Sequence, residues 1–148
     1  MRFRSGALAV LAALLLSGCV GPATTNDAYL GKARHAASAA VSELQTARLT
    51  VQTMLAGRLQ HLYTESVLSD NEDAISSVQQ SFDSIQPPET KRADKLRTSL
   101  DDLLSTGSDA VRELRIAARR HDDETLRVVT HQVESTIDKL DKYLDENQ

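Results

Sequence analysis

The residues able to do catalytic or metal chemistry are few in this 148-residue chain, and none stands in a common motif. The sequence has no phosphate-binding Gly-x-x-x-x-Gly-Lys-Ser/Thr loop, no dinucleotide-binding Gly-x-Gly-x-x-Gly and no Gly-x-Ser-x-Gly esterase turn. A di-metal helical bundle needs Glu-x-x-His on two helices, whereas the chain offers His131-x-x-Glu134 in the reverse order. We therefore predict no catalytic residue, no metal site and no cofactor.

The acidic pairs and runs favour structural roles over catalysis. The run Asp70-Asn71-Glu72-Asp73 lacks the glycine and the later glutamate of a calcium-binding loop. The pairs Asp101-Asp102 and Asp122-Asp123 would need a cleft to act as general acid and base. On the surface of a helical protein such carboxylates are solvated or cap a helix.

The single cysteine, Cys19, ends the most specific motif of the chain. Residues 1–4 are basic in character, and an apolar stretch of alanine and leucine follows from Gly6 to Leu16. A basic start, an apolar stretch and small residues before a cleavage point describe a secretory signal peptide. The stretch is shorter than the ~20 residues that a membrane-spanning helix needs. One cysteine cannot form an intramolecular disulfide or a thiolate metal cage, so Cys19 needs another role.

Leu16-Ser17-Gly18-Cys19 resembles the lipobox of bacterial lipoproteins, and residues 1–19 as a whole resemble their signal peptide. The resemblance implies that Cys19 becomes the first residue of the mature chain, is diacylated on its sulfur and is open to acylation on its amine. It divides the chain into a signal peptide (1–18), a lipidated tether (19–26) and a helical domain (27–148). Acyl chains at roughly 0.8 kcal/mol per buried CH₂ would anchor the protein to membrane lipid. The alternative is a soluble secreted protein with a fortuitous cysteine.

The net charge and the composition limit the possible binding partners and indicate the cellular location. Removal of residues 1–18 takes Arg2 and Arg4 with it and leaves 15 basic against 21 acidic residues, a formal charge of −6. This charge argues against nucleic-acid binding and against electrostatic attraction of the whole domain to anionic lipid. Arginine outnumbers lysine by twelve to five, as in high-GC bacterial genomes such as those of actinobacteria. We expect a lipid-anchored protein on the extracytoplasmic face of the cell membrane.

Apolar residues after Asp27 recur every three or four positions, which predicts four amphipathic helices and no strands. The four stripes are Ala33, Ala37, Ala40, Leu44, Ala47, Val51 and Met54 or Leu55; Ile75, Val78, Phe82 and Ile85; Ala93, Leu96, Leu100, Leu103, Gly107, Ala110, Leu114 and Ala117; and Leu126, Val129 or Thr130, Val133, Ile137, Leu140 and Leu144. Short turns at residues 86–89 and 120–122 make neighbouring helices antiparallel. The expected fold is an all-α, antiparallel up-down four-helix bundle.

Local signals predict where the helices begin. Asn26, Ser69 or Asp70, and Asp122 are suitable N-caps, and Ser69-x-x-Glu72 fits a capping box. Residues 57–69 are also predicted to be helical, either extending the first helix or covering the end of the bundle. Gly107 lies within a stripe, where glycine costs about 1 kcal/mol relative to alanine. We favour close packing over a kink as its explanation.

Basic residues gather at both ends of the predicted bundle. At the start of the third helix, Lys91, Arg92 and Lys95 would meet Asp138, Asp141 and Asp145 of the fourth, a weak surface complementarity. The opposite end gathers Arg58, His61, Arg112, Arg115, Arg119, Arg120, His121, Arg127 and His131. We predict that Arg112, Arg115, Arg119, Arg120 and His121 bind an acidic surface of a partner protein, because arginine forks suit carboxylates. The alternative is stabilisation of helix C-termini, worth about 0.3–1 kcal/mol per arginine.

These patterns favour a non-enzymatic function. We expect a cell-envelope lipoprotein that binds or modulates another envelope protein, or that has a structural role. The alternative is an extracytoplasmic sensor or carrier that holds a small ligand in the core of the bundle. The predicted stripes are aliphatic and contain no polar cluster, which favours a packed core.

The lipobox makes a prediction that intact mass can test. In a host that processes lipoproteins, the mature chain should begin at Cys19 and carry the mass of its acyl chains, because the lipobox directs both cleavage and acylation. Mass spectrometry of the purified protein measures this directly. A retained signal peptide, or a mature chain with unmodified Cys19, would refute the prediction.

Overall fold

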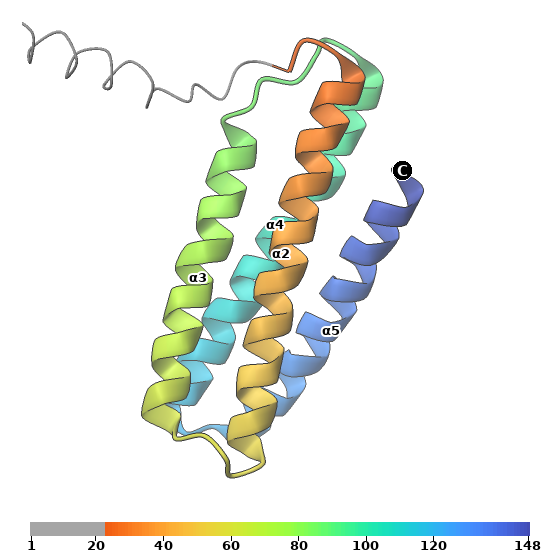
Figure 1. Cartoon of the computed structure of the whole chain (residues 1–148). Helices are drawn as coiled ribbons and strands as arrows, with labels where there is room; N and C mark the ends of the chain where they lie inside the picture. The colour runs from red at the N-terminus through yellow and green to blue at the C-terminus, as the bar shows by residue number, and fades with distance from the viewer. Residues whose placement is uncertain (1–22) are drawn as a thin grey trace, which may run out of the picture.

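A computed structural model describes residues 23–148, which form four α-helices and no strand (Figure 1). The helices are α2 (Asn26–Leu55), α3 (His61–Asp83), α4 (Lys91–Arg120) and α5 (Asp123–Glu146). They run alternately up and down, which confirms the predicted all-α, up-down four-helix bundle. Cys19 and the rest of the predicted signal peptide lie outside the described residues. None of the four helices is both long and apolar enough to cross a membrane.

Consecutive helices pack side by side, and α5 closes the ring against α2. Across the ring α2 also touches α4, whereas within the described chain α3 and α5 do not meet. The start of α2, the connection 84–90 and the end of α5 lie together, and we call this the proximal end (Figure 1). The connection 56–60 and the turn 121–122 form the opposite, distal end.

Side-chain caps fix the beginnings of three helices. Thr25, and not Asn26 as predicted, caps α2 by accepting a hydrogen bond from the Ala28 amide at 3.2 Å. Thr90 caps α4 in the same way, and its hydroxyl also donates to the Asn26 side-chain oxygen at 2.7 Å. Asn26 therefore joins the beginnings of two parallel helices. Asp122 caps α5 through the Thr125 amide at 3.0 Å, as predicted.

The prediction for the start of α3 is wrong. The helix begins at His61, so Ser69 and Asp70 lie inside it and form no capping box. The cause is Gly57, whose φ of +70° ends α2 in the left-handed conformation that glycine adopts without strain. The buried side chains of Thr64 and Leu68 then continue the inner face of α3 back toward its start. Residues 57–69 thus divide into a turn and the first part of α3, instead of extending α2 or covering the end.

The predicted stripes form the core with small shifts in register. Leu100, Leu114, Val133 and Leu140 are all buried. Leu104 is fully buried where the sequence indicated Leu103, and Tyr143 is buried where it indicated Leu144. These shifts arise because an α-helix repeats every 3.6 residues, so a stripe drifts around a long helix. Leu103 and Leu144 pack at the margin of the core.

Gly107 marks the point of closest packing. An added methyl group there would lie 3.2 Å from the Ile75 Cδ1 atom of α3 and 3.3 Å from the Leu44 Cδ1 atom of α2. Three helices therefore converge on a position that has no side chain. α4 runs through this point as a single helix from Lys91 to Arg120, so close packing explains the glycine.

The core assignment predicts the cost of shortening its leucines. Leu114→Ala or Leu140→Ala should lower the free energy of unfolding by about 2–5 kcal/mol, because each removes a fully buried side chain and leaves a cavity. Urea unfolding followed by circular dichroism measures the loss. Leu62→Ala is the matched control, since Leu62 is 79% exposed, and it should leave the midpoint nearly unchanged. Equal midpoints for all three variants would contradict the core assignment.

Candidate functional site

Two of the predicted partner-binding arginines, Arg112 and Arg115, contact a glutamate of the neighbouring helix. Arg115 donates from Nε to Glu72 Oε2 of α3 at 2.6 Å, and Arg112 Nε lies 3.2 Å from Glu72 Oε1. Arg112 also reaches Asp109 on its own helix at 2.9 Å. Burial raises the pKa of Glu72, but the hydrogen bonds and charges of Arg115 and Arg112 outweigh it and hold the pKa below its ordinary value. This cluster stabilises the α3–α4 interface.

A third predicted partner-binding arginine on α4, Arg119, pairs with Glu65 of α3 at 2.9 Å. Glu65 and Glu72 are two turns apart on α3, as Arg119 and Arg112 are on α4, so the antiparallel helices match charge to charge. The outer pair is worth at most ~1 kcal/mol because it is solvated. The half-buried Arg115–Glu72 pair is worth about 1.5–3 kcal/mol.

The last two predicted residues, Arg120 and His121, lie at the distal turn and are exposed. The α4 helix ends as α2 does: the amides of His121 and Asp122 donate back to the carbonyls of Ala118 and Ala117. At α2 this position is glycine, whereas here His121 takes the left-handed conformation, with φ of +56°. Its ring contacts the ring of His61, at 4.2 Å between centroids, and so joins the two distal connections.

Exposed apolar side chains share the distal half of the bundle with Arg120 and His121. The large hydrophobic residues exposed in the described chain are Leu49, Leu62, Tyr63 and Val128. Leu62 and Tyr63 stand on the first turn of α3, beside the distal connections, and are 79% and 61% exposed. Arg58 and Arg120 are exposed nearby, and neither makes an ion pair with a described residue. Protein-binding surfaces combine aromatic, apolar and arginine side chains in this way.

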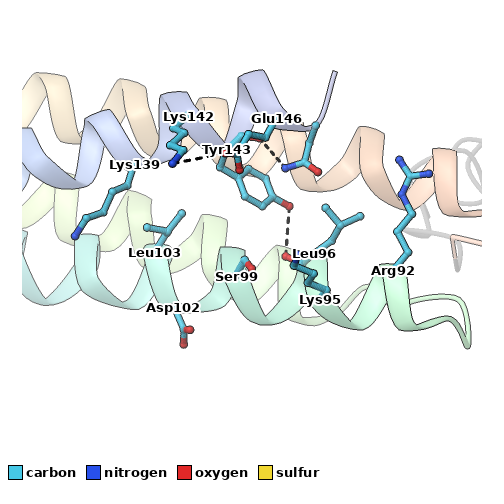
Figure 2. A pocket seen from close by; sticks show the side chains of 11 residues that line it. Arg92, Lys95, Leu96, Ser99, Asp102, Leu103, Lys139, Lys142, Tyr143 and Glu146 are labelled. Atoms are coloured by element: carbon cyan, nitrogen blue, oxygen red, sulfur yellow. Dashed lines mark hydrogen bonds and ion pairs between the residues drawn. The ribbon is translucent and has the colours of Figure 1, made fainter.

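A groove of about 700 Å³ lies between α4 and α5 at the proximal end (Figure 2). Its floor is apolar and comprises Leu96, Leu103 and the ring of Tyr143. The Tyr143 hydroxyl donates to the Leu96 carbonyl oxygen at 3.3 Å. Burial raises the pKa of Tyr143 to about 12, so the phenol keeps its proton and adds no negative charge to the floor.

The rim of this groove is basic, with Arg92 and Lys95 on α4 and Lys139 and Lys142 on α5. Lys142 pairs with Glu146 at 3.6 Å. The predicted meeting of Lys91, Arg92 and Lys95 with acidic residues of α5 does not occur, since no ion pair joins them within residues 23–148. Lys139 instead extends from α5 toward α4, and the Asp102 carboxylate is directed away from α5 (Figure 2). The groove therefore collects cations from both helices.

A second groove, of about 540 Å³, lies between α2 and α3. Small residues of α2, among them Gly31, Ala36 and Ala39, form one wall, and Val78 and Phe82 of α3 form the other. Lys32 and His35 stand at its edge. This groove is the more apolar of the two.

One residue of each acidic pair singled out in the sequence has a structural partner. Asp122 is engaged as a helix cap, and its hydrogen bonds to the backbone and side chain of Thr125 lower its pKa. Asp101 lies 3.5 Å from Arg97, which also approaches Asp83. Burial and the Asp83 charge raise the pKa of Asp101. Within residues 23–148 no three acidic, histidine or cysteine side chains stand together as metal ligands.

Comparison with known proteins found no match to this chain among family models, curated proteins or solved structures. The site must therefore be judged by its own geometry. Sequence reasoning missed the proximal groove, although one signal was available: the pairs Arg92/Lys95 and Lys139/Lys142 each have the three-residue spacing that places two cations on one helix face.

The Glu72 cluster predicts how stability changes in acid. Because the folded pKa of Glu72 lies below its ordinary value of 4.5, the carboxylate stabilises the fold above that pH, and this contribution is lost as the pH falls through the folded pKa. Glu72→Gln should lower stability at neutral pH by about 1–3 kcal/mol and flatten the acid limb of the stability curve. Urea midpoints measured from about pH 7 to pH 3 test both effects.

Glu113→Gln is the control for this series. It removes an exposed carboxylate that forms no ion pair with a described residue, so the acid limb should keep its wild-type slope. A Glu72→Gln variant with an unchanged slope would show that the Arg115 contact does not persist in solution.

Proposed function

We propose that the protein is a membrane-anchored lipoprotein of the cell envelope whose helical bundle binds another envelope protein and catalyses no reaction. The lipobox at Cys19 supports the anchor. The observation that carries the binding function is the concentration of exposed apolar residues and arginine at the distal end. The anchored chain would enter the bundle at the opposite, proximal end, so the distal end would face away from the membrane.

The binding surface that we propose comprises Arg58, Leu62, Tyr63, Arg120 and His121. Leu62 and Tyr63 supply apolar area, which stabilises protein interfaces most at their centre. Arg58 and Arg120 supply forks for carboxylates of the partner. His121 occupies a position where glycine would be less strained, by about 1–2 kcal/mol, so its side chain is expected to have a role at this surface.

The pairing of Arg112, Arg115 and Arg119 with Glu72 and Glu65 decides which variants can test this proposal. Charge reversal at those arginines would place like charges against the glutamates and destabilise the bundle. If these variants lost binding, the loss of the binding surface could not be separated from the loss of the fold. Arg58 and Arg120 have no such partner among the described residues, so they separate binding from folding.

Arg58→Glu combined with Arg120→Glu should reduce in-cell crosslinks to the partner about tenfold, because reversed charges oppose an acidic surface. Leu62→Ser combined with Tyr63→Ser should have a similar effect through loss of apolar contact. The matched control is Arg34→Glu with Lys91→Glu, which makes the same charge change at exposed positions away from the distal end. The helical circular-dichroism signal must remain that of the wild type. Undiminished crosslinks in both folded distal variants would refute the proposed surface.

The rival function is a sensor or carrier of a small ligand, and the α2–α3 groove favours it. Ligand pockets of about 300–1,000 Å³ with mainly apolar walls are typical of proteins that bind small molecules, and this groove has about 540 Å³. Ala39→Leu would fill it with little effect on the core, because Ala39 is half-buried. If the Ala39→Leu variant failed to replace the wild-type protein in cells but kept its crosslinks at the distal end, the sensor or carrier function would be favoured.

A further inference from the structure

We propose that the groove between α4 and α5 binds an anionic amphiphile, a molecule with an apolar chain and a negatively charged head. The head would lie beside Arg92 and Lys95 at one end of the groove, and the chain would run along Leu96 and Tyr143 toward Leu103, with Lys139 at the far end (Figure 2). This site goes beyond the proposed docking function, because it lies at the proximal end of the bundle and uses different residues.

The size and lining of the groove fit such a ligand. Its volume of about 700 Å³ lies within the range of small-molecule sites, which combine apolar walls with a few polar groups. Leu96 and Tyr143 are each 6% exposed, so they form a solid floor. The Tyr143 hydroxyl is already engaged by the Leu96 carbonyl, which leaves the ring as an apolar surface.

The charges at the rim select an anion. Most arginines between helices are already paired: Arg48 with Glu134, Arg97 with Asp83 and Asp101, and Arg112, Arg115 and Arg119 with α3. Arg92, Lys95 and Lys139 make no ion pair within the described chain. Arg92 also lies in the first turn of α4, where the helix dipole adds positive potential. Of the two carboxylates in the lining, Glu146 pairs with Lys142 and Asp102 is directed away from α5. The unpaired cations on both walls therefore concentrate anions in the groove, although the protein is acidic as a whole.

The apolar floor favours an amphiphile over simpler anions. Inorganic phosphate would satisfy the cations and leave the apolar floor in water. Nucleic acid would need a continuous basic surface and exposed rings for stacking, whereas Tyr143 is buried beneath the rim. An amphiphile satisfies both parts of the groove. It could come from the membrane, as an anionic phospholipid, or from solution, as a fatty acid.

Photocrosslinking distinguishes these sources. The protein as its host exports it would be mixed with phosphatidylcholine vesicles that contain a diazirine analogue of either phosphatidylglycerol or phosphatidylcholine. A third arm uses vesicles without a lipid probe and adds a soluble diazirine fatty acid. Mass spectrometry then locates the labelled peptides. We expect an anionic probe to label residues 92–103 and 139–147 about fivefold more than the phosphatidylcholine probe does.

Variants test the groove itself. Lys95→Gln with Lys139→Gln should reduce labelling by the anionic probe about fivefold or more, and Ser99→Trp should abolish it by filling the groove. Ser99 lines the groove but is only half-buried, so the bulky side chain does not enter the core. Arg34→Gln with Arg127→Gln removes two exposed charges elsewhere and should leave labelling unchanged.

Each result decides the proposal. Labelling by phosphatidylglycerol alone indicates a membrane lipid, and labelling by the fatty acid indicates a soluble ligand; both support the site. Equal labelling by the zwitterionic and anionic probes, or labelling that persists in folded Lys95→Gln/Lys139→Gln and Ser99→Trp variants, overturns it. The N-terminal mass of the same samples tests the anchor separately. An unmodified Cys19 with a labelled groove refutes the anchor alone, and a lipidated Cys19 with an unlabelled groove refutes this site alone.

Discussion

The contact between α2 and α4 across the centre of the bundle is the constraint on which the rest of the packing depends. A four-helix ring leaves a diagonal gap that side chains must fill or helices must close. Here α2 brings the fully buried Ala33, Ala37, Ala40 and Ala47 to the interior, and α4 brings Gly107, which leaves room for Leu44 and Ile75. The two helices thus approach along one diagonal while α3 and α5 stay apart in the described chain. Even alanine at Gly107 would require the Leu44 and Ile75 side chains to shift by a few tenths of an ångström, and a bulkier residue would crowd all three helices, because interiors are close-packed and cannot absorb extra volume cheaply.

The cations of this protein act in two different ways according to what faces them. Between α3 and α4, arginines meet glutamates whose spacing matches their own, so charge is neutralised and the interface is fixed. Between α4 and α5, Arg92, Lys95 and Lys139 line the two walls of a groove without an ion pair to any described residue, and their charge remains open to solvent and ligand. The first arrangement stabilises one packing of the helices. The second carries an electrostatic cost, since like charges repel, and that cost is reduced when an anion binds between them.

The sequence predicts the architecture well because helical periodicity and turn residues are local signals. The stripes, the short connections and the Asp122 cap are all readable without tertiary information, and the structure confirms them. The site was harder to predict for a specific reason. Whether Arg119 is free or paired depends on Glu65 belonging to α3, and this in turn depends on α3 beginning at His61 and not at Ser69. The groove depends on how far α4 and α5 separate near their proximal ends, which periodicity does not encode. The sequence contains the cations, and packing determines which of them find partners.

The distribution of aromatic residues gives the bundle two optically distinct ends. The chain has no tryptophan and three tyrosines, so tyrosine dominates its ultraviolet emission. Tyr29 and Tyr143 are buried at the proximal end, where the Tyr29 ring packs 5.7 Å from that of Phe82, whereas Tyr63 is exposed at the distal end. A soluble quencher such as iodide would reach Tyr63 first, and near-ultraviolet circular dichroism would report chiefly on the two ordered rings. Loosening of one end could therefore be followed apart from the other in the native chain, without an introduced label.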